Sequence, residues 1–276
     1  MSQLSLESGP ASTIVDTKAG GRLSALLVDD LPLLFTAPSV SVQWGSYPMV
    51  PWAGRVADGR FGFAGATHQL PLNMAPHAIH GVGFTSPWTV VDEATGSAGR
   101  ARVATIALDL PEPWPFGGRA VQRFELTGEA LTIELAVTAE VDMPVMLGWH
   151  PWFNRHLGMA DGSTVEAELT FLARSMYELD DRAIPTGRLV EPTPRPWDNC
   201  FTDVEQGPVL RWPGLVDLTL TSSCDHWVVF DRPGHAVCVE PQSAAPDVFN
   251  RAPEAGGPPT LAGGETARAW FRLAWG

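Results

Sequence analysis

Two side chains that can exchange protons stand at the ends of two apolar runs in this sequence. Glu240 closes the run AVCVE, and His150 follows the run VMLGW. A proline comes directly after each, so we expect both strands to stop there and Glu240 to emerge at a sheet edge or into a cleft. Burial raises the pKa of a carboxyl group, and imidazole titrates close to neutral pH. The two residue types predict general acid and base chemistry; the plainer alternatives are a surface ion pair and a core histidine.

Two other polar residues could hold the substrate of such a pair. Arg55 lies in GRVADGRFGF, in which Asp58 and Gly59 predict a tight type I′ turn between two short strands. On the arm of this hairpin Arg55 could donate to hydroxyl oxygens, or it could simply be exposed. Asp198, in PWDNCF, could accept hydrogen bonds from hydroxyls or cap a turn.

The pattern HAIHG, with His77 and His80, raises the question of a metal site. A third ligand could come from His150 or Glu240. Nothing near the two histidines completes such a site, and the residues between them predict a strand or turn rather than a helical pair of ligands. We therefore expect no metal.

Aromatic residues flank the same stretches, and the combination points to a sugar. Trp52, Trp149, Trp152 and Trp197 lie close to the polar residues in the sequence. A monosaccharide stacks the C–H face of its ring on an aromatic side chain, while its hydroxyls need donors and acceptors. Core packing accounts for some of these tryptophans, but the set as a whole predicts a monosaccharide as the ligand.

Charge and composition disfavour several other classes of protein. The net charge of −13 argues against nucleic-acid partners, which need clustered basic residues. Lys18 is the only lysine and lies in a polar turn, so a Schiff-base lysine has no candidate. The three cysteines lack C-x-x-C spacing, and we expect free thiols. No apolar run reaches a membrane span, and the N-terminus lacks a secretory signal pattern, so we expect no membrane partner and a cytoplasmic location.

The segments that must position these residues are predicted to be strands. Apolar and polar residues alternate with a period of two in seven segments: 22–30, 101–110, 120–128, 130–140, 163–173, 215–223 and 267–275. Glycine and proline clusters separate them, and the proline-rich stretches that begin at residues 111 and 191 predict long loops. Strands and helices do not alternate, so we expect an all-β fold of stacked antiparallel sheets, a large β-sandwich, as one domain over residues 1–276.

The order of these motifs along the chain resembles the aldose 1-epimerase (galactose mutarotase) family. The resemblance runs from about residue 45 to residue 250 and is carried by PWAGRVADGRFGF, HAIHG, HPWFN, WDNCF and EPQSAAPD. HPWFN is similar to the family's HPYFN-type motif, and Glu240, followed by Gln242 and then by Pro-Asp, is a second match. One departure is Gly54, where the family often has asparagine before the arginine, and this affects a predicted hydrogen bond to the sugar.

The resemblance implies a galactose mutarotase-like supersandwich with a sugar cleft on its concave face and no cofactor. It further implies that Glu240 is the general base and His150 the general acid of a mutarotase. The substrate-binding residues that it implies are Arg55, His80, Asp198, Gln242 and Trp152.

Three alternatives stay open at the level of sequence. A mutarotase of the same fold could act on a hexose 6-phosphate, for which Arg119, Arg123 and Arg155 could hold the dianion. A sugar-binding or sensor protein could keep the cleft without catalysis, although binding alone needs no acid and base. A glycoside hydrolase would use a carboxyl group as its acid, which suits a Glu and His pair less well.

Overall fold

Strands make up nearly all of the regular structure of this protein. The computed structural model describes residues 2–38, 42–95, 102–252 and 257–276. The strands of the first half of the chain are β1 (Gln3–Ser8), β2 (Ala11–Asp16), β3 (Arg22–Val28), β4 (Leu31–Pro32), β5 (Ser46–Met49), β6 (Arg55–Val56), β7 (Arg60–Phe63), β8 (Ala66–Gln69), β9 (Ala78–Ile79), β10 (Thr89–Thr95), β11 (Arg102–Asp109), β12 (Arg119–Leu126) and β13 (Ala130–Thr138). Short 3-10 helices are η1 (Ala57–Gly59), η2 (Gly83–Thr85) and η4 (Val248–Asn250).

The second half of the chain adds the strands that carry most of the predicted site. These are β14 (Met143–Pro144), β15 (Gly148–Asn154), β16 (His156–Gly158), β17 (Thr164–Glu166), β18 (Glu168–Leu179), β19 (Pro185–Val190), β20 (Asp198–Trp212), β21 (Val216–Ser222), β22 (His226–Phe230), β23 (Ala236–Gln242), β24 (Thr260–Leu261) and β25 (Thr266–Trp275). Among the described residues, no helix has the length and apolar character needed to cross a membrane.

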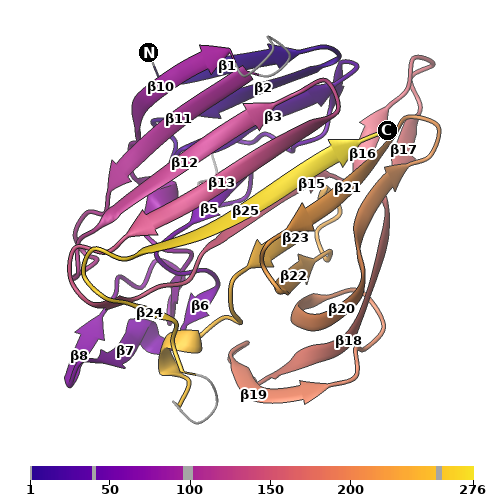
Figure 1. Cartoon of the computed structure of the whole chain (residues 1–276). Coiled ribbons are helices and arrows are strands. Elements are labelled where there is room, and N and C mark those ends of the chain that lie inside the picture. Colours follow the sequence, from indigo (N-terminus) through magenta and orange to yellow (C-terminus); the bar gives the residue numbers. More distant parts are fainter. Residues whose placement is uncertain (1, 39–41, 96–101, 253–256) are drawn as a thin grey trace.

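One large antiparallel sheet joins most of these strands. Backbone pairing runs from β10 through β11, β12, β13, β25 and β21 to β20, and several of these strands lie side by side in Figure 1. From β20 it continues through β22, β23, β15 and β5 to β3, β2 and β1. β18 pairs with β20 and β19 pairs with β18. The predicted all-β fold with a large antiparallel sheet is confirmed.

The alternating sequence pattern becomes a one-sided pattern of burial. In β2 and β12 every second residue is buried, as expected for strands with one face against the core. Each of the seven predicted segments contains strand, with 163–173 divided between β17 and β18 at Ala167. β15 and β23 differ, because nearly all their residues are buried. Their sequences therefore read as continuous apolar runs rather than as alternation.

The prediction that prolines end the two site strands is wrong. β15 continues through Pro151, which lies opposite Ser46, and the next N–H, that of Trp152, donates to the carbonyl of Gly45 at 2.8 Å. A proline lacks only its own N–H, so the rest of the ladder is kept. β23 likewise continues beyond Glu240, which therefore lies inside the sheet, between β15 and β22, and not at an edge.

The hairpin predicted around Asp58 and Gly59 is also wrong. Both residues have positive φ angles, 52° and 60°, as a type I′ turn would require. They belong to η1, however, and β6 pairs with β9 instead of with β7. The N–H of Asp58 donates to Nδ1 of His77, which directs the chain toward β9. Arg55 is thus on a short strand beside β9, and the hairpin in this region is β7–β8.

Candidate active site

Strand register places Glu240 opposite His150. Gly148 of β15 pairs with Gln242 of β23, and two residues further along each strand His150 lies across from Glu240 on the same face. On the other side of β15, Tyr47 of β5 pairs with His150. Side chains from three adjacent strands therefore form one row across the sheet.

The carboxyl group of Glu240 has a close polar contact on each of its oxygens. Nε2 of His150 lies 3.3 Å from Oε1, and Nε2 of Gln242 donates to Oε2 at 3.2 Å. Gly148 leaves the space that Gln242 needs, because a Cβ there would lie 2.8 Å from the carbonyl of Pro241 and 3.2 Å from Cγ of Gln242. The missing side chain at position 148 thus supports the orientation of the carboxyl group.

Burial drives the pKa values of this pair toward their neutral forms. Glu240 is 3% exposed, and burial, reinforced by the carboxylate of Asp198, raises its pKa well above 4.5. His150 is 5% exposed, and burial, reinforced by the cation of Arg22, lowers its pKa to about 3. The proton therefore rests on Glu240 and the imidazole is neutral, so the pair holds one exchangeable proton.

A second row of side chains lies beside the pair. Trp152 pairs with Cys238, Cys238 with Phe230, and Phe230 with Asp198 across four strands. The ring of Trp152 stacks on that of His150, with ring centroids 5.1 Å apart and an interplanar angle of 4°. An aromatic surface thus lies next to the imidazole, and Asp198 comes near the pair from the far side of the row.

Arg55 lies on the short strand β6, and His80 comes directly after β9, the strand that pairs with β6. The backbone of Gly54 forms two hydrogen bonds with His80. The N–H of Gly54 donates to Nδ1 of the ring at 3.3 Å, and the carbonyl of Gly54 accepts from the N–H of His80 at 3.1 Å. Nδ1 must therefore be unprotonated, which leaves Nε2–H as a donor. Burial, with His150 and Arg55 nearby, lowers the pKa of His80 well below 6.5, so its ring is neutral. The two histidine rings meet edge to face at 4.9 Å.

These side chains line one hollow of about 190 Å³. This is smaller than the roughly 300–1,000 Å³ typical of pockets for drug-sized ligands, and it favours a single small molecule. All seven residues predicted for catalysis or substrate binding face it: Arg55, His80, His150, Trp152, Asp198, Glu240 and Gln242. Residues far apart in the sequence are thus gathered at one place.

Sequence reasoning missed several residues of the hollow, Tyr47 and Met74 among them, and included aromatic residues that lie elsewhere. Tyr47, whose ring is 5.0 Å from that of His150, and the half-exposed Met74 both line it. Only the pairing of β5 with β15 reveals Tyr47, because no local motif marks it. Of the four tryptophans considered, only Trp152 lines the hollow; Trp149 packs on Phe271 on the opposite face of β15.

The other two tryptophans also pack against aromatic residues. Trp52 lies beside Trp114, and Trp197 meets Phe201 edge to face. Neither lines the hollow, so both serve packing rather than the predicted sugar contact.

Gly54, the position at which this sequence departs from the family pattern, packs closely against Pro246. A Cβ at position 54 would lie 2.6 Å from Cβ of Pro246, and the φ angle of Gly54 is +66°. Both facts favour glycine here. The space of a side chain at position 54 is filled by Pro246, which itself lines the hollow.

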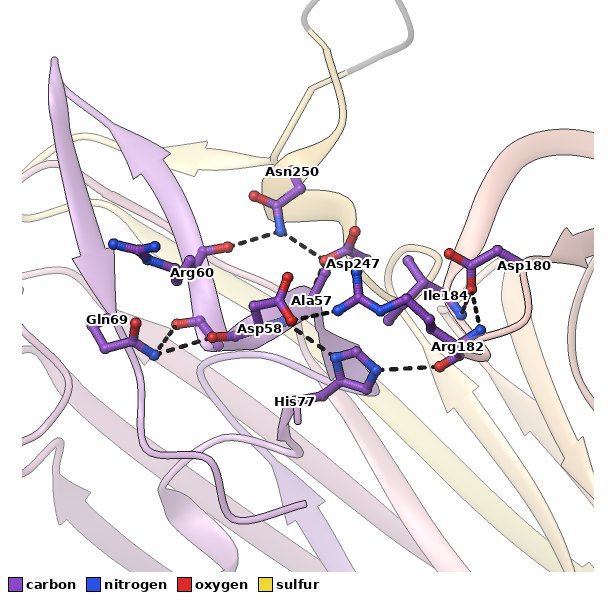
Figure 2. Close-up of polar contacts among 11 residues, drawn as sticks. Ala57, Asp58, Arg60, Gln69, His77, Asp180, Arg182, Ile184, Asp247 and Asn250 are labelled. Atoms are coloured by element: carbon purple, nitrogen blue, oxygen red, sulfur yellow. Dashed lines mark hydrogen bonds and ion pairs between the residues drawn. The ribbon is translucent and has the colours of Figure 1, made fainter. Parts of the chain in front are cut away.

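His77 does not join His80 in a metal site. Figure 2 shows its ring between the backbone of Asp58 and that of Arg182, and both ring nitrogens are engaged there.

One group of three metal donors exists within the described residues: His150, Cys238 and Glu240, with donor atoms within 4.8 Å of one another. His150 and Glu240 already contact each other, and burial raises the thiol pKa of Cys238 well above 9, which keeps it protonated. The group therefore consists of a carboxyl–imidazole contact beside a buried thiol. The three cysteines are free, as predicted.

Comparisons with known proteins agree with the geometry. The family model described as aldose 1-epimerase matches residues 2–274. The uncharacterized protein YphB of Escherichia coli K12 is 30% identical over 283 residues, which cover 93% of each chain.

Solved structures share the fold at lower sequence identity. A galactose mutarotase-like protein from Clostridium acetobutylicum is similar with a TM-score of 0.84 and 17% identity, covering 99% of this chain and 94% of the other. A galactose 1-epimerase from Lactobacillus acidophilus has a TM-score of 0.79 and 16% identity, with 99% and 94% covered. From the family match over nearly all of its length, together with the similarity to YphB, this chain belongs to the aldose 1-epimerase family.

Proposed function

We propose that this protein is a mutarotase that interconverts the α and β anomers of a free aldohexose. The observation that carries the proposal is the contact of Glu240 with His150, 3.3 Å apart, in the lining of a hollow sized for one small ligand. Arg55, His80 and Asp198 offer donors and acceptors around it, with Gln242 and Trp152 beside them.

The proposed reaction moves one proton at each of two sugar oxygens. Glu240 takes the proton of the C1 hydroxyl while His150 gives a proton to the ring oxygen. The bond between C1 and the ring oxygen breaks, and C1 becomes an aldehyde. After rotation about C1–C2 the reverse transfers close the ring on the other face. Each group of this kind typically contributes ~10² to 10⁴-fold, so the reaction needs no metal or covalent intermediate, and we propose none.

The pKa values of the pair determine which of its two forms is favoured before and after ring opening. Ring opening converts a carboxylate and an imidazolium into a carboxylic acid and an imidazole. Burial favours this second form, because it raises the pKa of Glu240 and lowers that of His150 to about 3. In the free protein burial keeps the proton on Glu240, so the reactive form first requires transfer of that proton to His150 across the 3.3 Å contact, at a cost in free energy.

A neutral sugar fits the hollow better than a hexose 6-phosphate. Arg119 pairs with Asp109, Arg123 pairs with Glu125, and Arg155 donates to the carbonyl of Asp231 and to Glu166. None of these three arginines lines the hollow. Among the described residues, Arg55 is the one arginine that does, and the carboxylate of Asp198, which also lines the hollow, would repel a dianion.

We further propose that residues 1–276 act as one domain, since one cluster of buried apolar side chains includes both Leu4 near the start and Leu273 near the end. A cytoplasmic location remains a prediction from the sequence.

Polarimetry or proton NMR of freshly dissolved α-D-glucose and α-D-galactose tests the function. We expect catalytic amounts of the protein to speed the approach to anomeric equilibrium. Glu240→Gln and His150→Asn should each reduce this acceleration by about 10² or more, with unchanged far-ultraviolet circular dichroism. Full activity in both variants would show that the roles are assigned wrongly, and no acceleration by the natural sequence would favour a sugar-binding protein without catalysis.

A further inference from the structure

His77 is a buried histidine that takes no direct part in the proposed reaction. It is 3% exposed and does not line the hollow. Figure 2 shows it at the centre of a polar network that connects η1, the segment before β9 and the turn between β18 and β19. Such a position calls for an explanation, because a histidine is rarely so completely buried without a structural or functional partner.

The two ring nitrogens of His77 have opposite roles. Nδ1 accepts a hydrogen bond from the N–H of Asp58 at 3.1 Å, so it carries no proton. Nε2 lies 3.2 Å from the carbonyl oxygen of Arg182, and a carbonyl can only accept, so Nε2 carries the proton. The ring is therefore a neutral, fixed tautomer that ties two separate backbone segments together.

One end of this connection leads to Arg55. Asp58 follows Arg55 by three residues, and β6 with Arg55 pairs with β9, which starts directly after His77. The same segment is held from a third side, because the N–H of Ala57 donates to Oδ1 of Asp247 at 2.8 Å and the N–H of Asp247 donates to the carbonyl of Arg55 at 2.8 Å. The position of Arg55 thus depends on the pairing of β6 with β9 and on the hydrogen bonds to Asp247.

The backbone of His77 also holds Met74, which lines the hollow. The N–H of each residue donates to the carbonyl of the other, at 2.9 and 3.1 Å. Next to it, Asn73 forms two hydrogen bonds with the backbone of Ile79, at 2.8 and 3.0 Å. The loop with Met74 is therefore fixed from within, while the ring of His77 is free to make the two longer-range contacts.

The other end leads to the turn between β18 and β19. Asp180 caps this turn by accepting from the N–H groups of Arg182 and Ile184 at 2.9 and 2.8 Å. The side chain of Arg182 also pairs with Asp58, but both side chains are about half exposed. Exposed ion pairs contribute little, so the buried ring of His77 is the stronger connection between the turn and η1.

We propose that His77 is a positioning residue of the sugar site: its ring holds η1, and through it Arg55, against the Asp180–Ile184 turn. The inference rests on the proposed mutarotase function, because it predicts how substrate binding responds. Arg55 is expected to contact the sugar in the ground state as well as in the transition state, whereas the Glu240–His150 pair is on the separate strands β23 and β15. Loosening of η1 should therefore raise KM and leave kcat largely unchanged.

Three substitutions of His77 distinguish the effects of its two ring hydrogen bonds, to Asp58 and to Arg182. In His77→Asn, the side-chain oxygen can replace Nδ1 as acceptor for Asp58, but the side chain is too short to reach Arg182. In His77→Gln, the amide can replace Nε2 as donor to Arg182 but places no acceptor at Asp58. His77→Ala lacks both. We expect KM to rise by about ten-fold in His77→Ala, the effect of losing one or two buried hydrogen bonds, with kcat changed less than about two-fold.

The bond to Asp58 is the one nearer to Arg55, so His77→Asn should restore more of the affinity than His77→Gln. His68→Ala serves as a control, because His68 is a hydrogen-bonded histidine, less buried than His77, whose ring bonds within its own hairpin, to the carbonyl of Phe63. It should keep the KM of the natural sequence. Asp180→Ala, which loosens the same turn from its other side, should produce a smaller rise in KM.

Hydrogen exchange measured by mass spectrometry reports on positioning without relying on activity. Peptides that cover residues 54–60 and 179–185 should exchange faster in His77→Ala, while peptides from β15 and β23 should not change. An unchanged KM together with unchanged exchange would overturn the inference even if the protein is an active mutarotase. A natural sequence without mutarotase activity would instead contradict the proposed function, and the exchange experiment would still decide whether His77 couples the two segments.

Discussion

Gln242 and His150 contact the two different oxygens of one buried carboxyl group, that of Glu240, at 3.2 and 3.3 Å. The carboxyl plane is therefore fixed before any ligand enters, with one oxygen toward a neutral amide and the other toward the imidazole. Such preorganisation matters because reacting groups must already stand in the geometry of the transition state. It also means that changes in the strands around the pair should affect catalysis.

The shared proton predicts an unusual pH dependence. Only the pair with one proton can both accept and donate, and burial lowers the pKa of His150 to about 3 and raises that of Glu240 well above 4.5. The second proton is thus gained only at strongly acid pH, and the shared proton is lost only above the normal range of a carboxyl group. We expect kcat/KM to stay level down to about pH 4 and to fall on the alkaline side. A loss of activity centred near pH 6.5, the ordinary value of histidine, would contradict this.

Glu240→Gln should make the protein more stable at neutral pH. Below pH 4.5 the carboxyl group holds its proton in the folded and the unfolded chain, so titration contributes no difference. Above pH 4.5 the unfolded chain gains by ionising while the folded carboxyl stays protonated, until the pH reaches its raised pKa. In that window the natural sequence loses about 1.4 kcal/mol per pH unit relative to the variant. Denaturant unfolding at several pH values measures this, and a stability difference independent of pH would refute it.

Gly148→Ala should impair catalysis from outside the hollow. Its Cβ would lie 3.0 Å from Cε of Met49 and 3.2 Å from Cγ of Gln242, so Gln242 must shift away from Glu240. We expect kcat to fall about ten-fold, because the carboxyl group loses one of its two fixed contacts. Gly158→Ala, on β16 with open space around the added Cβ, is the matched control and should keep full activity. Steady-state polarimetry on both variants checks the difference.

Glucose 6-phosphate should not compete with glucose. Arg119, Arg123 and Arg155 are engaged away from the hollow, so no arginine beyond Arg55 is placed there among the described residues. We expect thermal shifts with millimolar glucose or galactose and none with the same concentration of glucose 6-phosphate. Stronger stabilisation by the phosphorylated sugar would reverse the assignment of the substrate.

Local sequence was enough to select residues that the fold gathers around one hollow. The HPWFN and EPQ motifs mark His150, Glu240 and Gln242, because the residue types within each short motif are local information. Alternation with period two identified the strands for the same reason, and glycine and proline clusters identified the loops that begin at residues 111 and 191.

Long-range pairing decided the rest. Whether Pro151 ends a strand depends on which backbone groups of β5 face it, and whether Asp58 forms a hairpin depends on His77, nineteen residues away. The sequence alone determined which side chains could perform proton transfer and that they lie on strands. Only the tertiary structure decided that β15 and β23 are neighbours in a register that sets His150 against Glu240, because hydrogen-bonded pairing between strands about ninety residues apart depends on the whole sheet and not on the residues near either motif.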